Sequence, residues 1–252
     1  MRLVTLLILS IGMLFSKGVW DGQTRFTIIE NNQGQIRVRS FDPSSLQGTE
    51  MIIPGDLDIQ SLGGRGSWSA KNIFKAGPSA WAAGSIIDYL GLGYVGAWDN
   101  LSVWNKLAWM LYQNKVSWAT VELSRGGLTS VVTMPDGQSV RRLNSVWFGQ
   151  AKQLFASKAV TDKHLSLSIV NTTDAAGLGS HAADVAESLG FKVDAVTDSP
   201  DKIAKCRLEA LPVLVKDVVI KLLARTFACD VVAGPDEELK MWLGQNYKTT
   251  LR

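Results

Sequence analysis

The sequence predicts an α/β protein built from three parts. An apolar run at the N-terminus predicts a signal or anchor helix over residues 1–20. Alternating apolar and polar residues from position 24 to 55 predict an antiparallel meander, which opens an α+β domain over 21–158. Strand-like and helix-like segments then follow each other in a βαββαβ-type order, which predicts a small α/β sandwich over 159–252.

The N-terminal apolar run, Leu3–Phe15, follows Arg2 and ends before Ser16 and Lys17. A membrane-spanning helix needs about 20 apolar residues, whereas the apolar part of a signal peptide has roughly 7–15. The run therefore predicts export, with the segment either cleaved or kept as a short membrane anchor. The alternative is a buried first helix, although such a helix would lack a polar face. We expect extracytoplasmic domains held at the cell membrane, or a secreted protein.

The charge distribution argues against one class of partner. The 252 residues carry 26 basic and 23 acidic side chains, for a formal net charge of +3 at pH 7. Lysine and arginine do not gather in runs, and no helix-turn-helix pattern with a basic face appears. We therefore do not expect nucleic acid as a partner.

The two cysteines, Cys206 and Cys229, both lie in the last quarter of the chain. In an oxidising compartment they can pair in a disulfide, and two buried free thiols are the alternative. The sequence has no C-x-x-C motif and its two histidines are isolated, so we expect no zinc site.

The meander consists of strands at 24–30, 35–41 and 49–55, the first two joined by the turn-forming residues NNQG. A glycine-rich loop and a helix-like segment follow. The next helix has Pro78 near its start and Gly91 past its end, which is the usual placement of these two residues.

The segment 101–114 is predicted to be a helix, with Asp99 or Asn100 as its N-cap. A stripe of its side chains at helical spacing is expected to face the core rather than a ligand. These residues are Leu101, Trp104, Leu107, Ala108 and Leu111. Short strands at 94–98 and 118–123 flank this helix. A hairpin over 128–143 turns at the residues PDG, and a helix at 146–156 leads into the last domain.

A glycine-rich loop follows the first predicted strand of the third part, which ends at Asn171. It holds Gly177, Gly179 and Ala182 in the spacing G-x-G-x-x-A. A dinucleotide-binding turn places its first glycine directly after the strand, but here six residues, 172–177, follow the strand before that spacing is complete. A lone motif of this kind is weak evidence. A nucleotide-dependent enzyme is therefore the least favoured function.

Two further features favour a structural explanation of this loop. The acidic residue of a dinucleotide site should end the second strand, whereas Asp194 lies in the middle of that strand and Asp198 just past it. The glycines allow a wide turn to pass close to the sheet, and Ser180 is expected to cap the following helix.

Spaced motifs of the third part carry a family resemblance. A strand ends in Asn171, Gly177 and Leu178 open the helix, and GFKV follows at 190–193. The end of the chain holds LGQNY at 243–247. In this order the motifs resemble the LytR C-terminal domain of many LytR–CpsA–Psr (LCP) cell-envelope proteins. The resemblance covers residues 163–250, with Gly179 where alanine is usual and Asn246 where aspartate is usual. It implies structural roles for Asn171, Gly177, Leu178, Gly244 and Tyr247.

Residues 25 to about 100 are similar, more weakly, to the LCP catalytic domain. The resemblance rests on RVRSFDPSSLQGTEMIIPGDLDI at 37–59 and IIDYLGLGYVGAW at 86–98. It implies transfer of glycans from a polyprenyl pyrophosphate carrier to the cell wall. That chemistry uses arginines to hold the pyrophosphate and carboxylates to hold Mg²⁺.

Departures from the LCP pattern put this activity in doubt. The family's Arg-Asp pair becomes Gly55-Asp56, and its Arg-Ser-Asp-Thr motif and arginine-rich helix have no counterpart. Asp56, Asp58 and Arg65 are the candidates that remain for a rearranged site. Arg141 and Arg142 fall in the predicted hairpin, where we expect a solvated face.

The sequence thus predicts a non-catalytic cell-envelope protein without a cofactor, which binds or scaffolds at the cell wall or membrane surface. Its N-terminus would contact the membrane. A cell-wall glycan, a lipid-linked precursor or another envelope protein would be its ligand. The alternative is an LCP-type phosphotransferase that uses Mg²⁺, followed by a nucleotide-dependent enzyme.

Overall fold

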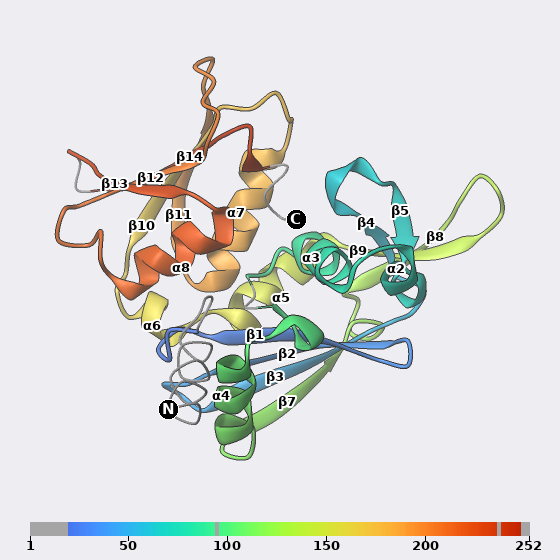
Figure 1. The fold of residues 1–252 in the computed structure, drawn as a ribbon. Coiled ribbons are helices and arrows are strands. Elements are labelled where there is room, and N and C mark those ends of the chain that lie inside the picture. The colour runs from blue at the N-terminus through green and yellow to red at the C-terminus, as the bar shows by residue number, and fades with distance from the viewer. Residues whose placement is uncertain (1–19, 94–95, 236–237, 248–252) are drawn as a thin grey trace, which may run out of the picture.

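The computed structural model describes residues 20–93, 96–235 and 238–247. Within these residues the chain forms two five-stranded sheets and two small two-stranded ones, with helices packed against them (Figure 1). The α/β class is therefore confirmed. The signal or anchor helix expected over 1–20 lies outside the described residues except for Trp20. Among the described helices, none is long and apolar enough to cross a membrane.

The first sheet contains the predicted meander. Its strands β1, β2 and β3 pair antiparallel, while β6 and β7 add parallel to β1 and β3 at the two edges. The strands span Phe26–Asn32 (β1), Gln35–Asp42 (β2), Gln47–Ile53 (β3), Gly96–Ala97 (β6) and Ser117–Glu122 (β7). The strand predicted at 94–98 is thus described only as β6.

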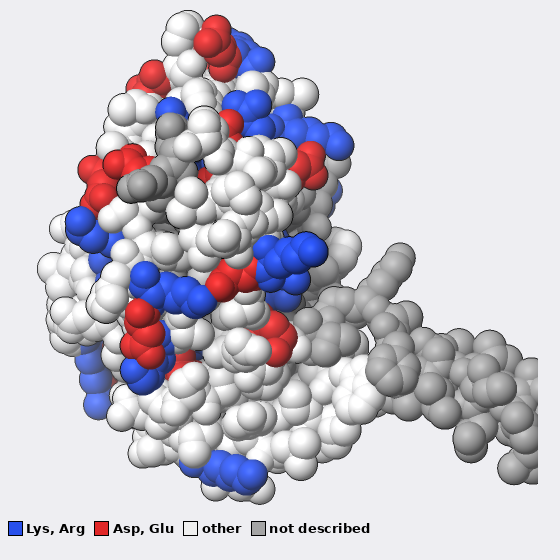
Figure 2. Space-filling model, turned by 90° about the vertical axis from the view of Figure 1, so that its left-hand side faces the viewer, with Lys and Arg blue, Asp and Glu red and all other residues white. Residues whose placement is uncertain are grey.

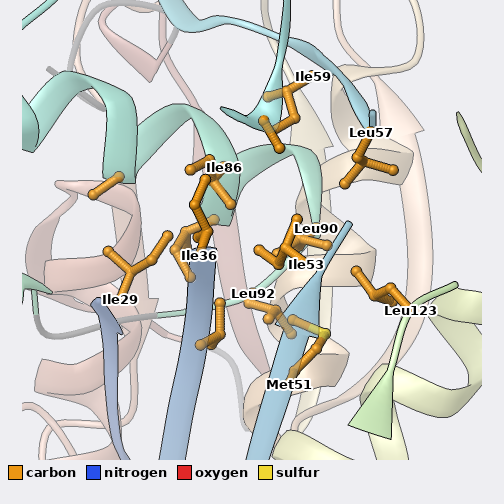
Figure 3. Packing of buried hydrophobic residues seen from close by; sticks show 14 of the residues in the cluster. Ile29, Ile36, Met51, Ile53, Leu57, Ile59, Ile86, Leu90, Leu92 and Leu123 are labelled. Atoms are coloured by element: carbon orange, nitrogen blue, oxygen red, sulfur yellow. The ribbon is translucent and has the colours of Figure 1, made fainter. Parts of the chain in front are cut away.

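Helices cover both faces of this sheet because side chains alternate along its strands. Ile29 and Met51 belong to one core, which α3 and α5 close from above in Figure 1. Ile28 and Phe41 point the opposite way and pack against α4. Figure 3 shows the first of these cores. The helices here are α2 (Ala70–Ala76), α3 (Ser79–Tyr89), α4 (Val103–Gln113) and α5 (Ser145–Phe155).

Two small hairpin-like pairs stand beside the first sheet. Strands β4 (Asp58–Gln60) and β5 (Ser67–Ser69) pair antiparallel around the 3₁₀ turn η1 (Leu62–Gly64). Strands β8 (Thr129–Thr133) and β9 (Ser139–Leu143) form the predicted hairpin.

The second sheet has the strand order β11-β10-β14-β12-β13, with α7 and α8 sharing one core on one face. Its elements are α6 (Lys158–Thr161), β10 (Ser166–Asn171), α7 (Leu178–Leu189), β11 (Lys192–Asp198), β12 (Arg207–Ala210), α8 (Val218–Phe227), β13 (Asp230–Ala233) and β14 (Leu239–Leu243). Compared with the predicted βαββαβ order, the structure adds β13 before β14.

Helix α4 differs from its prediction in two ways. Its N-cap is Ser102, whose Oγ accepts a hydrogen bond from the Asn105 N–H at 3.2 Å; Asp99 and Asn100 lie in the preceding 3₁₀ turn η2 (Trp98–Asn100). The predicted core stripe is also wrong at Leu107 and Leu111, which are exposed. The helix buries Asn105 and Trp109 instead, because Trp109 packs on Phe26 and Phe41 of the sheet.

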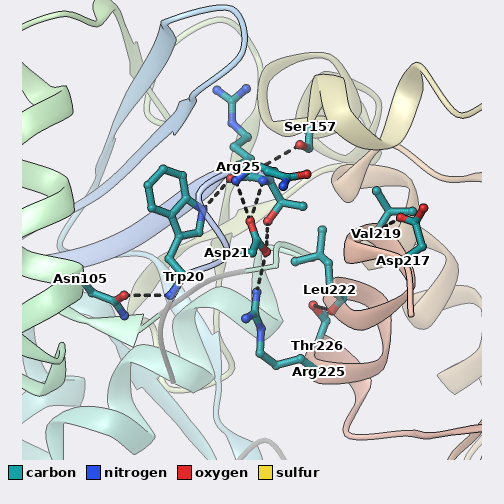
Figure 4. Close-up of polar contacts among 12 residues, drawn as sticks. Trp20, Asp21, Arg25, Asn105, Ser157, Asp217, Val219, Leu222, Arg225 and Thr226 are labelled. Atoms are coloured by element: carbon teal, nitrogen blue, oxygen red, sulfur yellow. Dashed lines mark hydrogen bonds and ion pairs between the residues drawn. The ribbon is translucent and has the colours of Figure 1, made fainter. Parts of the chain in front are cut away.

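The segment after Trp20 connects both halves of the molecule (Figure 4). Asp21 lies 3.6 Å from Arg225 of α8. The Arg25 N–H donates to Ser157 Oγ at 3.1 Å, and the Arg25 guanidinium donates to Ser40 Oγ at 2.8 Å. Burial lowers the pKa of Arg25 to about 10, although the charge of Asp42 opposes this shift.

A histidine–carboxylate pair joins α7 to α3, with His181 Nε2 2.8 Å from Asp88 Oδ1. Burial lowers the pKa of His181, but hydrogen bonding to Asp88 and the charges of Asp88 and Asp184 outweigh it. The pKa is therefore raised above 6.5. A second link, Lys152 with Glu187, joins α5 to α7 nearby.

This pair predicts a pH-dependent contribution to stability. Because the pKa of His181 is raised on folding, the contribution is fully present below the unfolded pKa of about 6.5 and is lost as pH rises through the folded pKa. We expect a loss of about 1 kcal/mol or less, as for a partly exposed pair. Urea unfolding from pH 5.5 to 8.5 should show this decline, and His181→Gln should remove it. An equal decline in the variant would contradict the assignment.

Candidate functional site

The carboxylates Asp56 and Asp58 meet two arginines of the β8–β9 hairpin. The hairpin folds back along the segment before β4, so that the Arg141 N–H donates to the Asp56 carbonyl oxygen at 3.1 Å. Leu57 and Arg141 form an isolated parallel bridge at the same place. We call Asp56, Asp58, Arg141 and Arg142 the Asp–Arg quartet.

The two ion pairs of the quartet differ in geometry and in the exposure of their side chains. Arg142 donates from Nε and Nη2 to the same oxygen, Asp58 Oδ2, at 3.1 and 2.9 Å. Arg141 Nε lies 3.3 Å from Asp56 Oδ1. The side chain of Asp58 is 12% exposed and that of Asp56 is 51% exposed. The arginines show the reverse order, with Arg142 44% and Arg141 21% exposed, so the two-pronged contact is what distinguishes the Asp58–Arg142 pair.

Core packing fixes the position of the quartet. Leu57, between the two carboxylates, is fully buried in the first core, and Figure 3 shows it beside that cluster. On the other side, the Leu143 N–H donates to Tyr89 Oη at 3.4 Å. Burial raises the pKa of Tyr89, with the Leu143 hydrogen bond lowering it and the charge of Asp58 adding to the rise. The site thus borders a neutral phenol.

Arg65 does not join the quartet. Its guanidinium lies over the Trp81 ring, 5.3 Å from the centroid, and its carbonyl accepts from Trp68 Nε1 at 3.1 Å. The arginines that contact the two carboxylates are instead Arg141 and Arg142, for which a solvated face was expected. Both ion pairs do lie at the surface, where the side chain of Arg142 is 44% exposed, but local sequence patterns do not reveal them because 84 and 85 residues separate the partners.

The quartet has both residue types of a pyrophosphate site, but the two types are paired with each other. Two carboxylates and two guanidiniums sum to zero formal charge. Within the described residues, no three His, Cys, Asp or Glu side chains gather in a way that could hold a metal ion. One oxygen of each carboxylate already accepts from a guanidinium, and the two positive charges beside the carboxylates disfavour Mg²⁺ at the quartet as it stands.

A double-mutant cycle can test the difference between the two pairs. We expect a coupling energy of about 1 kcal/mol between Asp58 and Arg142, because their contact is two-pronged and partly buried. The Asp56–Arg141 pair should give a few tenths of a kcal/mol. The measurement is urea unfolding of Asp58→Asn, Arg142→Gln and their combination, with the matching set at 56 and 141. Equal couplings would contradict the structural difference.

Hydrogen bonds of Asn171 hold the glycine-rich loop in place. Asn171 Nδ2 donates to Ala175 O at 3.3 Å and to Asp198 Oδ1 at 3.0 Å, while its Oδ1 accepts from the Thr173 N–H at 3.1 Å. The residue at the N-cap of α7 is Gly177, with a φ of 79°. The expected cap Ser180 is wrong, since the helix begins at Leu178 before it.

This loop also fixes how close α7 approaches the sheet. A Cβ on Gly179 would lie 2.7 Å from Val196 Cγ1 of β11. Leu178 packs against the second core. Asp194 pairs with Lys192 at 2.7 Å rather than facing the loop. Gly177 is therefore explained by its left-handed backbone and Gly179 by its close packing on β11.

The end of β14 docks onto the segment before β12. Gly244 lies against the Lys205–Cys206 backbone, and Asn246 Oδ1 accepts from the Cys206 N–H at 2.8 Å. Tyr247 is buried on Phe227, with ring centroids 5.5 Å apart, and burial strongly raises its pKa. A disulfide joins Cys206 to Cys229.

No protein-family model matches this chain, and no curated protein matches it. Among solved structures, it is similar to the LytR-CPS2A-psr family protein YwtF (TagT) with bound octaprenyl pyrophosphate lipid. That match has 8% identity and a TM-score of 0.27, and covers 94% of this chain and 91% of that one. For B. subtilis TagV the identity is 9%, the TM-score 0.25 and the coverage 91% and 94%. Because both TM-scores lie below 0.5, membership of the LCP family remains a prediction from the sequence motifs.

Proposed function

We propose that this chain is a non-catalytic cell-envelope protein attached to the membrane by its N-terminal segment. Residues 21–158 would form a degenerate LCP-like domain and residues 159–252 a LytR C-terminal-like domain. The supporting observation is the Asp–Arg quartet. Transfer from a polyprenyl pyrophosphate needs guanidiniums that face the leaving phosphate and carboxylates that face Mg²⁺. In the quartet these groups neutralise each other.

The expected ligand is a cell-wall glycan or a lipid-linked precursor. This follows from the motif resemblance at 37–59, 86–98 and 163–250. The protein would hold the ligand, or another envelope protein, at the outer surface of the membrane without changing it chemically.

The test is an assay of the full chain in detergent with a polyprenyl-pyrophosphate-linked glycan, with and without Mg²⁺. We expect no turnover in either condition, and binding that Mg²⁺ does not strengthen. Transfer or hydrolysis that depends on Mg²⁺ and disappears in Asp58→Asn would overturn the proposal. The circular dichroism spectrum of the variant would show whether its fold is intact.

One observation favours the phosphotransferase alternative. The quartet gathers two guanidiniums and two carboxylates on one surface, and an arriving pyrophosphate can exchange for the carboxylates as the partner of Arg141 and Arg142. In that case Arg142→Lys, which loses the two-pronged contact, should lower turnover by about 10²-fold. The matched control is Arg125→Lys, because Arg125 pairs with Glu122 elsewhere on the surface. Equal activity of both variants would exclude this alternative.

A further inference from the structure

Helix α4 carries a solvent-exposed apolar stripe. Val103, Leu107, Met110 and Leu111 are 69%, 43%, 54% and 59% exposed. The described residues include eleven exposed large hydrophobic side chains, and four of them lie on this one helix. At 100° per residue these four positions fall within an arc of about 100°. We call these four residues the α4 stripe.

Two lysines border the stripe. Lys106 borders it and lies over the Trp98 ring, 5.7 Å from the centroid, and Lys115 follows the end of the helix. No aspartate or glutamate occurs from residue 101 to 121. In Figure 2 the lower part of the molecule, at the level of α4 and β7, is largely white, whereas acidic and basic groups interleave above it. An apolar face with a lysine rim is typical of helices that lie on anionic lipid.

The described chain begins at this same helix, on the buried side that faces the sheet. The Trp20 N–H donates to Asn105 Oδ1 of α4 at 2.9 Å, as Figure 4 shows. The Trp20 ring packs edge-on against Tyr112, also of α4, with centroids 5.6 Å apart. Only four residues, 16–19, lie between the end of the apolar run Leu3–Phe15 and Trp20. Such a connection spans at most about 17 Å, which is about the length of α4 itself.

We infer that the α4 stripe lies against the lipid surface of the membrane, beside the point where the run Leu3–Phe15 enters it. Lys106 and Lys115 would then reach anionic headgroups. A second copy of the chain fits this face less well, because its own stripe has the same lysine rim and offers no opposite charge. The inference rests on the proposed membrane attachment and adds to it a fixed orientation of the first sheet.

The test uses the full chain in vesicles of phosphatidylglycerol and phosphatidylethanolamine. A bimane label on Leu111→Cys reports contact with doxyl-labelled lipids through quenching. The reference label is placed on Val213→Cys, since Val213 is the most exposed large hydrophobic residue outside α4. We expect fluorescence at position 111 to fall by about half, as a burial of about 5–10 Å would give, and fluorescence at 213 to stay unchanged.

A second set of variants isolates the stripe from the anchor. Leu107→Asp with Met110→Asp should abolish quenching at position 111 while the chain still floats with vesicles. Val131→Asp, which changes an exposed residue of β8, should leave the quenching intact. Both expectations follow from the cost of placing a carboxylate among apolar groups.

Each other outcome overturns the inference in a distinct way. If the chain floats but the label at 111 is not quenched, the orientation is wrong while membrane attachment stands. If the chain does not float, both the attachment and the orientation fail. If the label is shielded from water-soluble iodide but not quenched by doxyl lipid, and the chain cross-links as a dimer, a second copy covers the stripe.

Discussion

Loss of the disulfide between Cys206 and Cys229 is expected to lower the free energy of unfolding of the second sheet by about 3 kcal/mol. The cross-link closes a loop with a sequence separation of 23, which restricts the unfolded chain. The loop contains β12 and α8, and therefore much of the second core. The predicted loss is a large part of the stability of a small domain.

Urea unfolding followed by circular dichroism, with and without dithiothreitol, measures this loss. The variant Cys206→Ala with Cys229→Ala should unfold at the same lower urea concentration as the reduced chain, and dithiothreitol should not change it further. Alanine suits position 206, because Cys206 is fully buried among apolar residues. A reduced chain as stable as the oxidised one would contradict the assignment of the disulfide as a stabilising link.

Local sequence patterns were sufficient for most of the fold. The meander follows from two-residue alternation, and its three strands lie within two residues of the predicted ranges. The second sheet follows from the order of its strands and helices. The missed strand β13 has only four residues, Asp230–Ala233, directly after α8. So short a segment carries little periodicity.

Helix α4 shows where periodicity fails. Apolar residues occur around much of this helix, so spacing alone did not identify the face that meets the sheet. The deciding features are Asn105, which accepts from Trp20, and Trp109, which packs on the strands. Both depend on residues far away in sequence. The predicted stripe is instead partly the surface that we place on lipid.

The sequence predicted the two carboxylates of the candidate site but not their arginine partners. Asp56 and Asp58 stand in a recognisable motif position, but the hairpin that carries Arg141 and Arg142 gives no local sign of its partner. Ion pairs across 84 or 85 residues are set by the register of the hairpin on the segment before β4. Local sequence patterns do not predict which of the two carboxylates pairs with which arginine.

Substitution of Gly244 is expected to be the most damaging single glycine change in the second sheet. A Cβ there would lie 2.4 Å from the Lys205 carbonyl carbon and 2.7 Å from the Cys206 nitrogen. These are backbone atoms, held by hydrogen bonds from Gln245 N–H to Ile203 O and from Asn246 N–H to Ala204 O, both at 3.0 Å. Neither the segment after β14 nor the segment before β12 can move away without breaking these hydrogen bonds. Gly244→Ala should therefore cost about 2–3 kcal/mol.

The matched control is Gly149→Ala in helix α5, where a Cβ would meet nothing within 4 Å. There alanine should stabilise by about 0.5–1 kcal/mol, because it lowers the backbone entropy of the unfolded chain and favours the helix. Thermal unfolding of the two variants should thus shift in opposite directions from the parent chain. If Gly244→Ala did not change the free energy of unfolding, β14 and the segment before β12 could move apart without cost. The burial of Tyr247 on Phe227 would then need another explanation, since this close backbone contact is what brings Tyr247 to the second core.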